Sequence, residues 1–389
     1  MNILDDLFIN IGQWWTNLLS ETLSLQDGVV TVINGLIGGL ILALLGVVMV
    51  LALTYMERKV FSRLQDRIGP NRWGPLGIFQ AVCDAIKMLT KEDIVPDKAD
   101  KLLFNLAPIL MVIPAVLLYA ALPFGRGMVG SNLSVGVLYV VGIGSLTGIA
   151  VMTAGWSSNN KYGLLGAFRV VAQLVSYEIP MVLSMASVVL LTGSMSLVDI
   201  VEKQTIPNFV LMPVAFFIYT TAAMAELGRS PFDLLEADSE IVAGYFIEYS
   251  GMKFALFFLA EYINLFAVAG LITTMFLGGW QWPILPGWLW FFIKTFVVIF
   301  FFIWMRGSWP RFRIDHMLNF AWKFLVPLAL ANIMVVALVD KLLQDTGEAV
   351  RAAALLSSNI LLIIITLAVV AWAGRRSRNV KLEAIVGAR

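Results

Sequence analysis

The sequence predicts an all-α integral membrane protein with about nine transmembrane helices and one amphipathic helix at the membrane surface. Of its 389 residues, 59% are hydrophobic and only 14% are charged, whereas soluble domains average about 45–50% apolar and about 25% charged residues. The mean hydropathy is +0.85. Repeated apolar stretches reach the roughly 20 residues that a helix needs to cross a bilayer, and basic residues gather in alternate connecting segments.

The expected spans are helices because lipid satisfies no exposed backbone polar group. They lie near residues 29–55, 102–122, 133–154, 164–191, 209–225, 254–277, 286–305, 320–339 and 354–373. No internal repeat or low-complexity tract interrupts the series. We therefore expect a single polytopic membrane domain over residues 1–389.

The distribution of Lys and Arg predicts the orientation, because these residues concentrate on the cytoplasmic side of a membrane. Residues 1–57 contain neither, which also argues against a cleaved signal peptide, and residues 58–101 contain nine. With the N-terminus outside, 20 of the 27 basic residues fall in inner segments. Nine crossings then place the C-terminus in the cytoplasm. We expect a multi-pass protein of a bacterial inner membrane, in preference to an organellar inner membrane.

The first inner loop contains an amphipathic segment from Gly77 to Glu92. Its apolar and polar residues recur on opposite sides of a helix, with Phe79, Val82, Ile86 and Leu89 facing away from Gln80, Asp84, Lys87 and Lys91. Such a helix lies in the membrane interface. Two interpretations stay open: an interfacial helix with solvated charges, or the lined entrance to a site for a lipid-like substrate.

A second inner loop, residues 226–253, is rich in acidic residues. These are Glu226, Asp233, Glu236, Asp238, Glu240 and Glu248. Crowded carboxyl groups near apolar walls are expected to have raised pKa values and to titrate together. A solvated loop is one interpretation. The apolar residues between the acids favour the other, a folded segment with a functional role.

Three acidic residues lie within or at the ends of expected spans, namely Glu178, Glu226 and Glu261. A charged group at the centre of a membrane helix costs about 2.5–3.5 kcal/mol, so such groups usually face protein or water. They are either structural partners of buried bases such as Arg169, Lys294 or Arg306, or members of a proton-exchanging chain.

The composition excludes several classes of function for this chain. Near-neutral charge, with 27 basic and 26 acidic residues, gives no support to nucleic-acid binding. Cys83 and His316 are the only residues of their types, too few to hold an iron–sulfur cluster or a bis-histidine haem. We find no nucleotide-binding fingerprint. Any electron transfer therefore requires a cofactor held by another chain.

Several strings resemble one known family. They are Glu57-Arg58-Lys59, Arg67-Ile68-Gly69-Pro70-Asn71, Lys91-Glu92-Asp93, Ala154-Gly155-Trp156-Ser157-Ser158-Asn159-Asn160-Lys161-Tyr162, Ser176-Tyr177-Glu178, Arg229-Ser230-Pro231-Phe232-Asp233 and Glu248-Tyr249-Ser250-Gly251-Met252-Lys253-Phe254. The chain thereby resembles the quinone-proximal membrane subunit of respiratory complex I, which is the H subunit of bacterial proton-translocating NADH:quinone oxidoreductases. The resemblance covers residues 50–335 and leaves 354–373 as an extra C-terminal helix.

The resemblance implies that this subunit forms a quinone chamber and an acidic path that couples quinone reduction to proton translocation. The path would consist of Glu178, Glu226, Glu236, Asp238, Glu240 and Glu261, and the quinone-binding residues would be Arg58, Asp84, Lys87, Arg306, Phe232 and Asp233. Many family members read Glu-Ala-Glu where this chain has Glu236-Ala237-Asp238, so the reach of that carboxyl group shortens by one methylene.

The resemblance further implies that the chain holds no redox centre, metal or cofactor of its own. Quinone would be the substrate, with FMN and iron–sulfur clusters in partner subunits. The partners would be the soluble subunit with the terminal iron–sulfur cluster, small and antiporter-like membrane subunits, and lipid. Two alternatives stay open: a proton-coupled secondary transporter, and the equivalent membrane subunit of a proton-pumping hydrogenase.

Overall fold

The protein is a bundle of long helices, seen here in a computed structural model that describes residues 7–22, 26–233, 243–343 and 347–386. Within these residues the only strands form a two-stranded antiparallel hairpin, β1 (Pro123–Gly125) and β2 (Met128–Val129). The helical elements are α1 (Leu7–Asn17), η1 (Leu18–Thr22), α2 (Asp27–Leu64), η2 (Pro75–Gly77), α3 (Gln80–Thr90), α4 (Lys101–Ala121), α5 (Gly136–Gly144), α6 (Leu146–Ser157), α7 (Lys161–Thr192), α8 (Leu197–Glu202), α9 (Asn208–Leu211), α10 (Pro213–Glu226), η3 (Gly244–Phe246), α12 (Gly251–Phe276), α13 (Gly287–Ser308), α14 (Ile314–Phe320), η4 (Ala321–Leu325), α15 (Val326–Leu342) and α16 (Glu348–Val386).

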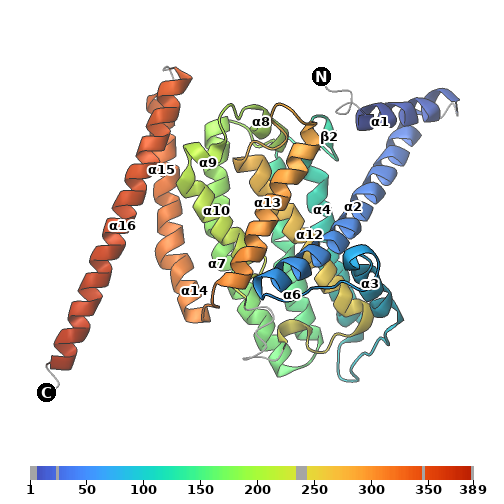
Figure 1. Ribbon diagram of the computed structural model, residues 1–389, viewed down its shortest axis with the longest axis horizontal. Helices are drawn as coiled ribbons and strands as arrows, with labels where there is room; N and C mark the ends of the chain where they lie inside the picture. Colours follow the sequence, from blue (N-terminus) through green and yellow to red (C-terminus); the bar gives the residue numbers. More distant parts are fainter. Residues whose placement is uncertain (1–6, 23–25, 234–242, 344–346, 387–389) are drawn as a thin grey trace.

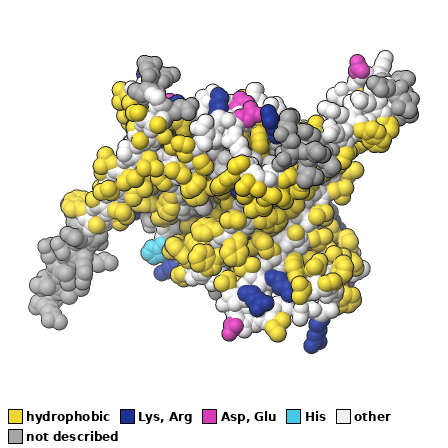
Figure 2. All heavy atoms as spheres, turned by 45° about the horizontal axis from the view of Figure 1, so that its top comes forward, with side chains coloured by type: hydrophobic (Ala, Val, Ile, Leu, Met, Phe, Trp, Pro, Cys, Tyr) yellow, Lys and Arg dark blue, Asp and Glu magenta, His cyan; other side chains and the backbone are white. Residues whose placement is uncertain are grey.

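Eight helical segments among the described residues are long and apolar enough to cross a membrane, which confirms the predicted all-α membrane class. One of them combines α5 with α6, and another combines α14, η4 and α15. A hydrophobic band covers the middle of the molecule, and charged side chains gather toward its ends (Figure 2). This distribution matches the apolar interior and polar surfaces of a bilayer.

The fifth expected span, residues 209–225, differs from the other eight. It consists of the short α9 followed by α10, with a break at Met212 and Pro213. Met212 has a non-helical backbone (φ −130°, ψ 65°), and Pro213 begins α10, where its missing backbone N–H needs no partner within the helix. At 14 residues, α10 alone is about 21 Å long at about 1.5 Å per residue, which is shorter than the hydrocarbon core.

The long helices run between two ends of the bundle (Figure 1). Helix α1 lies across one end, and α16 runs to the opposite end. Helix α12 is the most buried of the long helices and packs against α2, α4 and α13. Helices α15 and α16 pack on each other at the side, where α15 also contacts α7.

The amphipathic segment of the first inner loop forms α3, which lies beside the end of α2 (Figure 1). Its apolar side chains Val82, Ile86 and Leu89 are exposed on the protein surface. On the opposite side, Asp84 forms an ion pair with Arg58 of α2. The helix therefore presents an apolar face to its surroundings and attaches to the bundle through its polar face.

Close packing of α6 against α7 depends on Gly155. A Cβ at this position meets the Cβ of Ala167 and lies 2.8 Å from the carbonyl oxygen of Gly163. By contrast, a Cβ at Gly148 of the same helix meets no atom within 4 Å. The two glycines therefore form a matched pair for testing this contact.

We expect Gly155→Val to destabilise the protein by about 1–3 kcal/mol, because overpacking forces the two helices apart. The midpoint of thermal unfolding of the purified assembly measures this effect. Gly148→Val is the control, since it introduces the same side chain where space is open. Equal midpoints for the two variants contradict the packing described for α6 and α7.

Candidate functional site

A cluster of buried charges joins four separate parts of the chain. Nη1 of Arg229 lies 3.1 Å from Oε1 of Glu57, and its Nη2 lies 3.0 Å from Oε1 of Glu261. Arg306 also forms an ion pair with Glu57. The hydroxyl of Tyr262 donates a hydrogen bond of 2.7 Å to Oε2 of Glu57. We call these five residues the ion cluster.

The elements that supply the ion cluster meet where α2, α12 and α13 approach the turn after α10. Gly228 turns the chain with a φ of +61°, a conformation that glycine adopts without a steric penalty. Gln173 of α7 holds both sides of this turn, because its Nε2 donates to the carbonyls of Ala225 (2.6 Å) and Phe232 (2.8 Å). Arg229 is thus fixed between its two carboxylates.

Arg229 is 4% exposed and Glu57 is 5% exposed, so both charges are removed from water. Burial on its own lowers the pKa of Arg229, but the carboxylates of Glu261 and Glu57 outweigh it and raise that pKa above its usual value. The guanidinium therefore stays charged. Its carbon also lies 4.8 Å from the centre of the Tyr262 ring, a cation–π contact that further favours the charged form.

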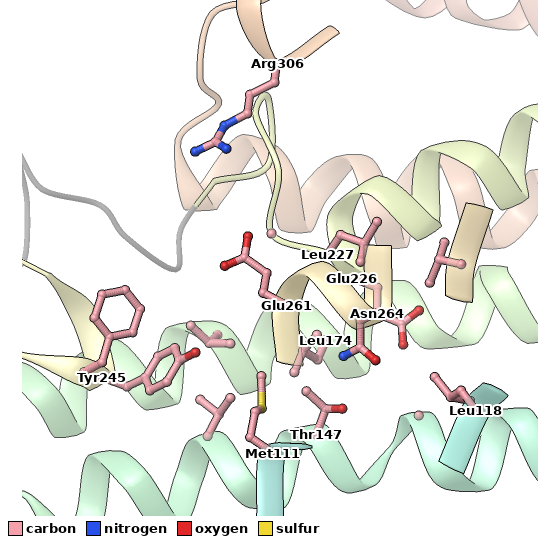
Figure 3. Close-up of a pocket in the computed structure, with 16 residues that line it drawn as sticks. Met111, Leu118, Thr147, Leu174, Glu226, Leu227, Tyr245, Glu261, Asn264 and Arg306 are labelled. Atoms are coloured by element: carbon pink, nitrogen blue, oxygen red, sulfur yellow. The ribbon is translucent and has the colours of Figure 1, made fainter. Parts of the chain in front are cut away.

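A cavity of about 50 Å³, here named the acid cavity, borders the ion cluster. Its polar lining includes Glu226, Glu261, Asn264 and Arg306 (Figure 3). Oε2 of Glu226 and Oδ1 of Asn264 are buried without a hydrogen-bond partner in the structure. The volume is enough for a few water molecules, each of which needs at least about 10–15 Å³.

A larger cavity of about 530 Å³, here named the α2 cavity, also borders the ion cluster. Glu57, Arg58 and Tyr262 line it, and so does Arg306, which also lines the acid cavity. Members of the ion cluster therefore line two cavities. A charge that appears in either cavity faces members of the same electrostatic network.

The structure places several of the predicted path residues near one another. Glu226 and Glu261 line the same cavity, and Glu178 of α7 is close enough to Glu226 for the two carboxyl groups to interact electrostatically. Glu236, Asp238 and Glu240 lie outside the described residues. The predicted path is thus represented here by three carboxyl groups.

The predicted quinone-binding residues fall into three places. Arg58, Asp84 and Lys87 form one group, in which Nζ of Lys87 lies 3.7 Å from Oδ1 of Asp84. Arg306 belongs to the ion cluster, and Asp233 is close enough to interact electrostatically with Glu261. Phe232 precedes Asp233 in the chain, but its ring packs in an aromatic cluster whose members include Tyr177, Phe312 and Phe320, and it lines a different cavity.

Three members of the ion cluster were not among the predicted site residues. Glu57 stands in a charged string of the first inner loop, Arg229 is the base within the acidic loop, and Tyr262 follows Glu261 directly. Arg229 carried a usable signal, because one base among six acids at a membrane boundary suggests a buried partner. Its partner Glu57 is 172 positions away in the sequence. A local sequence pattern cannot predict a pairing over such a separation.

The intramembrane acids were expected to be either partners of buried bases or proton-exchanging groups, and the structure favours a different interpretation for Glu261 than for Glu226. Glu261 has a buried base as its ion-pair partner, Arg229, and Arg306, one of the bases expected from the sequence, is close enough to interact with it electrostatically. Lys294, another of those bases, instead donates to the carbonyl oxygens of Leu277, Gly279 and Gln281. Glu226 has an unsatisfied oxygen in a cavity, which favours the proton-exchanging interpretation for this residue.

In the part of the chain that the structure describes, no group of three His, Cys, Asp or Glu side chains is arranged to hold a metal ion. The site combines buried ion pairs, an unpaired carboxyl oxygen and two adjoining cavities within a membrane bundle. Together they define a polytopic membrane protein with buried charges and cavities inside its helical bundle.

Comparisons with known proteins agree with this class and identify the family. A family model described as NADH dehydrogenase matches residues 37–337. The chain is 52% identical over 304 residues to the H subunit of the NADH-quinone oxidoreductase of Dehalococcoides mccartyi strain CBDB1, covering 78% of this chain and 86% of that protein. It is 51% identical to the protein of the same name from Carboxydothermus hydrogenoformans (77% and 89% covered) and 48% identical to that from Geobacillus thermodenitrificans (80% and 96% covered).

The chain therefore belongs to the family of H subunits of NADH-quinone oxidoreductases, the membrane subunits of complex I. The resemblance found in the sequence is confirmed. The protein is a subunit of a multi-subunit, translocating oxidoreductase, so the secondary-transporter and hydrogenase alternatives lose their support.

We expect Arg229→Gln to destabilise the assembly by about 3–5 kcal/mol, because it leaves two buried carboxylates without their partner. The midpoint of chaotrope-induced dissociation measures the loss. Arg63→Gln, at an exposed position of α2, is the control. The double variant Arg229→Gln/Glu261→Gln should recover part of the loss, since coupled residues deviate from additivity by about 0.5–3 kcal/mol. If the losses of stability of the two single variants simply add in the double variant, the ion pair between Arg229 and Glu261 is contradicted.

Proposed function

We propose that this subunit forms the wall of the quinone chamber of a bacterial proton-translocating NADH:quinone oxidoreductase and couples quinone reduction to proton movement through its buried charges. The reaction class comes from the names of the relatives. The observation that carries the proposal is that members of the ion cluster line both the α2 cavity and the acid cavity, with Arg306 lining both.

The approach of the quinone runs along α3 in this proposal. The exposed apolar face of α3 suits an isoprenoid tail that arrives from the bilayer. Arg58, Asp84 and Lys87 then meet a polar headgroup at the mouth of the α2 cavity, and Arg306 meets it further inside. Asp233 acts through its neighbour Glu261, whereas Phe232 packs against Tyr177 of α7 and lines neither the α2 cavity nor the acid cavity.

The chemistry requires protons from the protein. Reduction of a quinone to a quinol consumes two electrons and two protons. The electrons come from a partner subunit, because this chain has one cysteine and one histidine and no redox centre of its own. The residues of this chain hold and deliver the protons, and they hold the negative charge that remains when a proton leaves.

The coupling is electrostatic. Two unit charges 4 Å apart interact by about 4 kcal/mol at an effective dielectric constant of about 20. A charge change beside Glu57 is therefore large enough to alter the protonation of carboxyl groups on the far side of Arg229. Glu261 receives this effect first, then Glu226 and Glu178.

The remaining part of the proposed path includes Glu236, Asp238 and Glu240, which lie outside the described residues. Antiporter-like membrane subunits receive the effect, and the soluble subunit with the terminal iron–sulfur cluster docks on the inner loops. The N-terminus faces the periplasm and the C-terminus the cytoplasm. This orientation is supported by the basic inner loops and by the opposite positions of α1 and the end of α16 (Figure 1).

We expect Glu226→Gln and Glu178→Gln each to lower both the quinone reductase rate and proton pumping by at least about tenfold, since a positioned proton-transfer group contributes about 10²–10⁴-fold. Assays of the reconstituted complex in proteoliposomes measure both. Glu202→Gln, an exposed position at the end of α8, is the control. Wild-type rates and pumping in both variants remove these carboxyl groups from the path.

We expect Arg58→Gln or Asp84→Asn to raise the KM for quinone by up to about fivefold with little change in kcat. An ion pair near the surface is worth about 0.2–1 kcal/mol, which sets this limit. Steady-state kinetics with a short-chain quinone measure the effect, and Arg63→Gln of the same α2 helix is the control. An unchanged KM in both variants excludes this pair from the entrance.

A further inference from the structure

A third cavity opens between α10, the loop that follows it, α13 and the α14–η4 segment. Its volume is about 590 Å³, within the range of about 300–1,000 Å³ that is typical of small-molecule sites. None of the five members of the ion cluster lines it. We call it the lateral groove.

The walls of the lateral groove are mostly aromatic. Phe320 and Phe324 stack with their ring centres 5.2 Å apart, and both line the groove. Phe217 and Trp309 also line it and are 49% and 52% exposed. One wall includes η4, a turn of π-helix, and such irregular turns frequently occur at functional sites. The groove thus offers an apolar trough on the surface of the bundle.

Basic residues line this trough or are next in sequence to residues that line it. His316 lines the groove and lies four residues before Phe320, on the same side of α14. Arg313 precedes the helix and is exposed, and Lys323, next to Phe324, is exposed within the expected span. Figure 2 shows the single histidine of the chain beside a basic side chain, at the lower edge of the hydrophobic band.

No described residue forms an ion pair with Arg313 or Lys323. The one acidic residue in the described segment 309–325 is Asp315. A lysine within a membrane span costs about 2.5–3.5 kcal/mol unless it snorkels or pairs. Basic pockets between membrane helices on the cytoplasmic side are typical sites for anionic lipid headgroups.

We propose that the lateral groove binds one acyl chain of an anionic glycerophospholipid of the inner leaflet, with the phosphate beside Arg313, His316 and Lys323. The position in the inner leaflet follows from the orientation proposed above. A quinone has a neutral headgroup and gains nothing from three basic side chains. A helix about 10 Å across would fill this volume with only about five residues, so the groove suits a single chain better than a partner helix.

Photolabelling of the assembled complex tests the proposal. The probes are phosphatidylglycerol and phosphatidylcholine that carry the same photoreactive acyl chain. We expect phosphatidylglycerol to label the peptide with Phe320 and Phe324 at least about fivefold more than phosphatidylcholine does. The double variant Arg313→Gln/Lys323→Gln should remove this preference. Lys341→Gln, exposed at the far end of the α14–α15 span, should leave it unchanged.

A second variant separates the groove from the charges. Thr221→Trp fills the groove without changing any charge, and it should lower labelling by both lipids. Equal labelling by the two lipids in the wild-type complex overturns the proposal. So does labelling that Thr221→Trp leaves intact, or a cross-link that places a helix of another subunit in the groove. None of these readouts depends on quinone reductase activity, so they stand apart from the proposed function.

Discussion

The structure depends on one buried arginine that is held between two carboxylates. Arg229 has almost no contact with water, and it connects Glu57 near the end of α2 with Glu261 of α12. Removing such charges from water costs several kcal/mol for each ion, and only close pairing offsets that cost. The packing of α2, α12 and α13 is therefore constrained by the need to keep opposite charges within about 3 Å.

This constraint also explains the loop after α10. Gln173 is buried and donates to carbonyl groups on both sides of Arg229. Without it, two backbone oxygens would lose hydrogen bonds inside the bundle, where each loss costs about 1–3 kcal/mol. The side-chain amide of Gln173 on α7 thus helps to hold the backbone on both sides of Arg229 in place. The hydrogen bond from Gln173 to the carbonyl of Ala225 also fixes the backbone next to Glu226, at the end of α10.

The all-α membrane class, eight of the expected spans and the surface helix α3 could be predicted from the sequence, because hydrophobic length and periodicity are local properties. The fifth span was expected as one helix, and the break at Met212–Pro213 shows that composition alone does not fix continuity. The carboxyl groups Glu226 and Glu261 were found because acids in apolar segments are conspicuous. Glu57 was not, since its burial follows from a pairing across 172 residues.

The break between α9 and α10 has a consequence for the C-terminal helix. Lipid cannot satisfy free backbone groups, so interrupted helices persist in membranes only where protein covers them. Helix α16 packs against both α9 and α10, and Met212 at the junction is fully buried. The terminal helix lies beyond the region matched by the family model. It covers the break between α9 and α10 and thereby separates the free backbone groups there from lipid acyl chains.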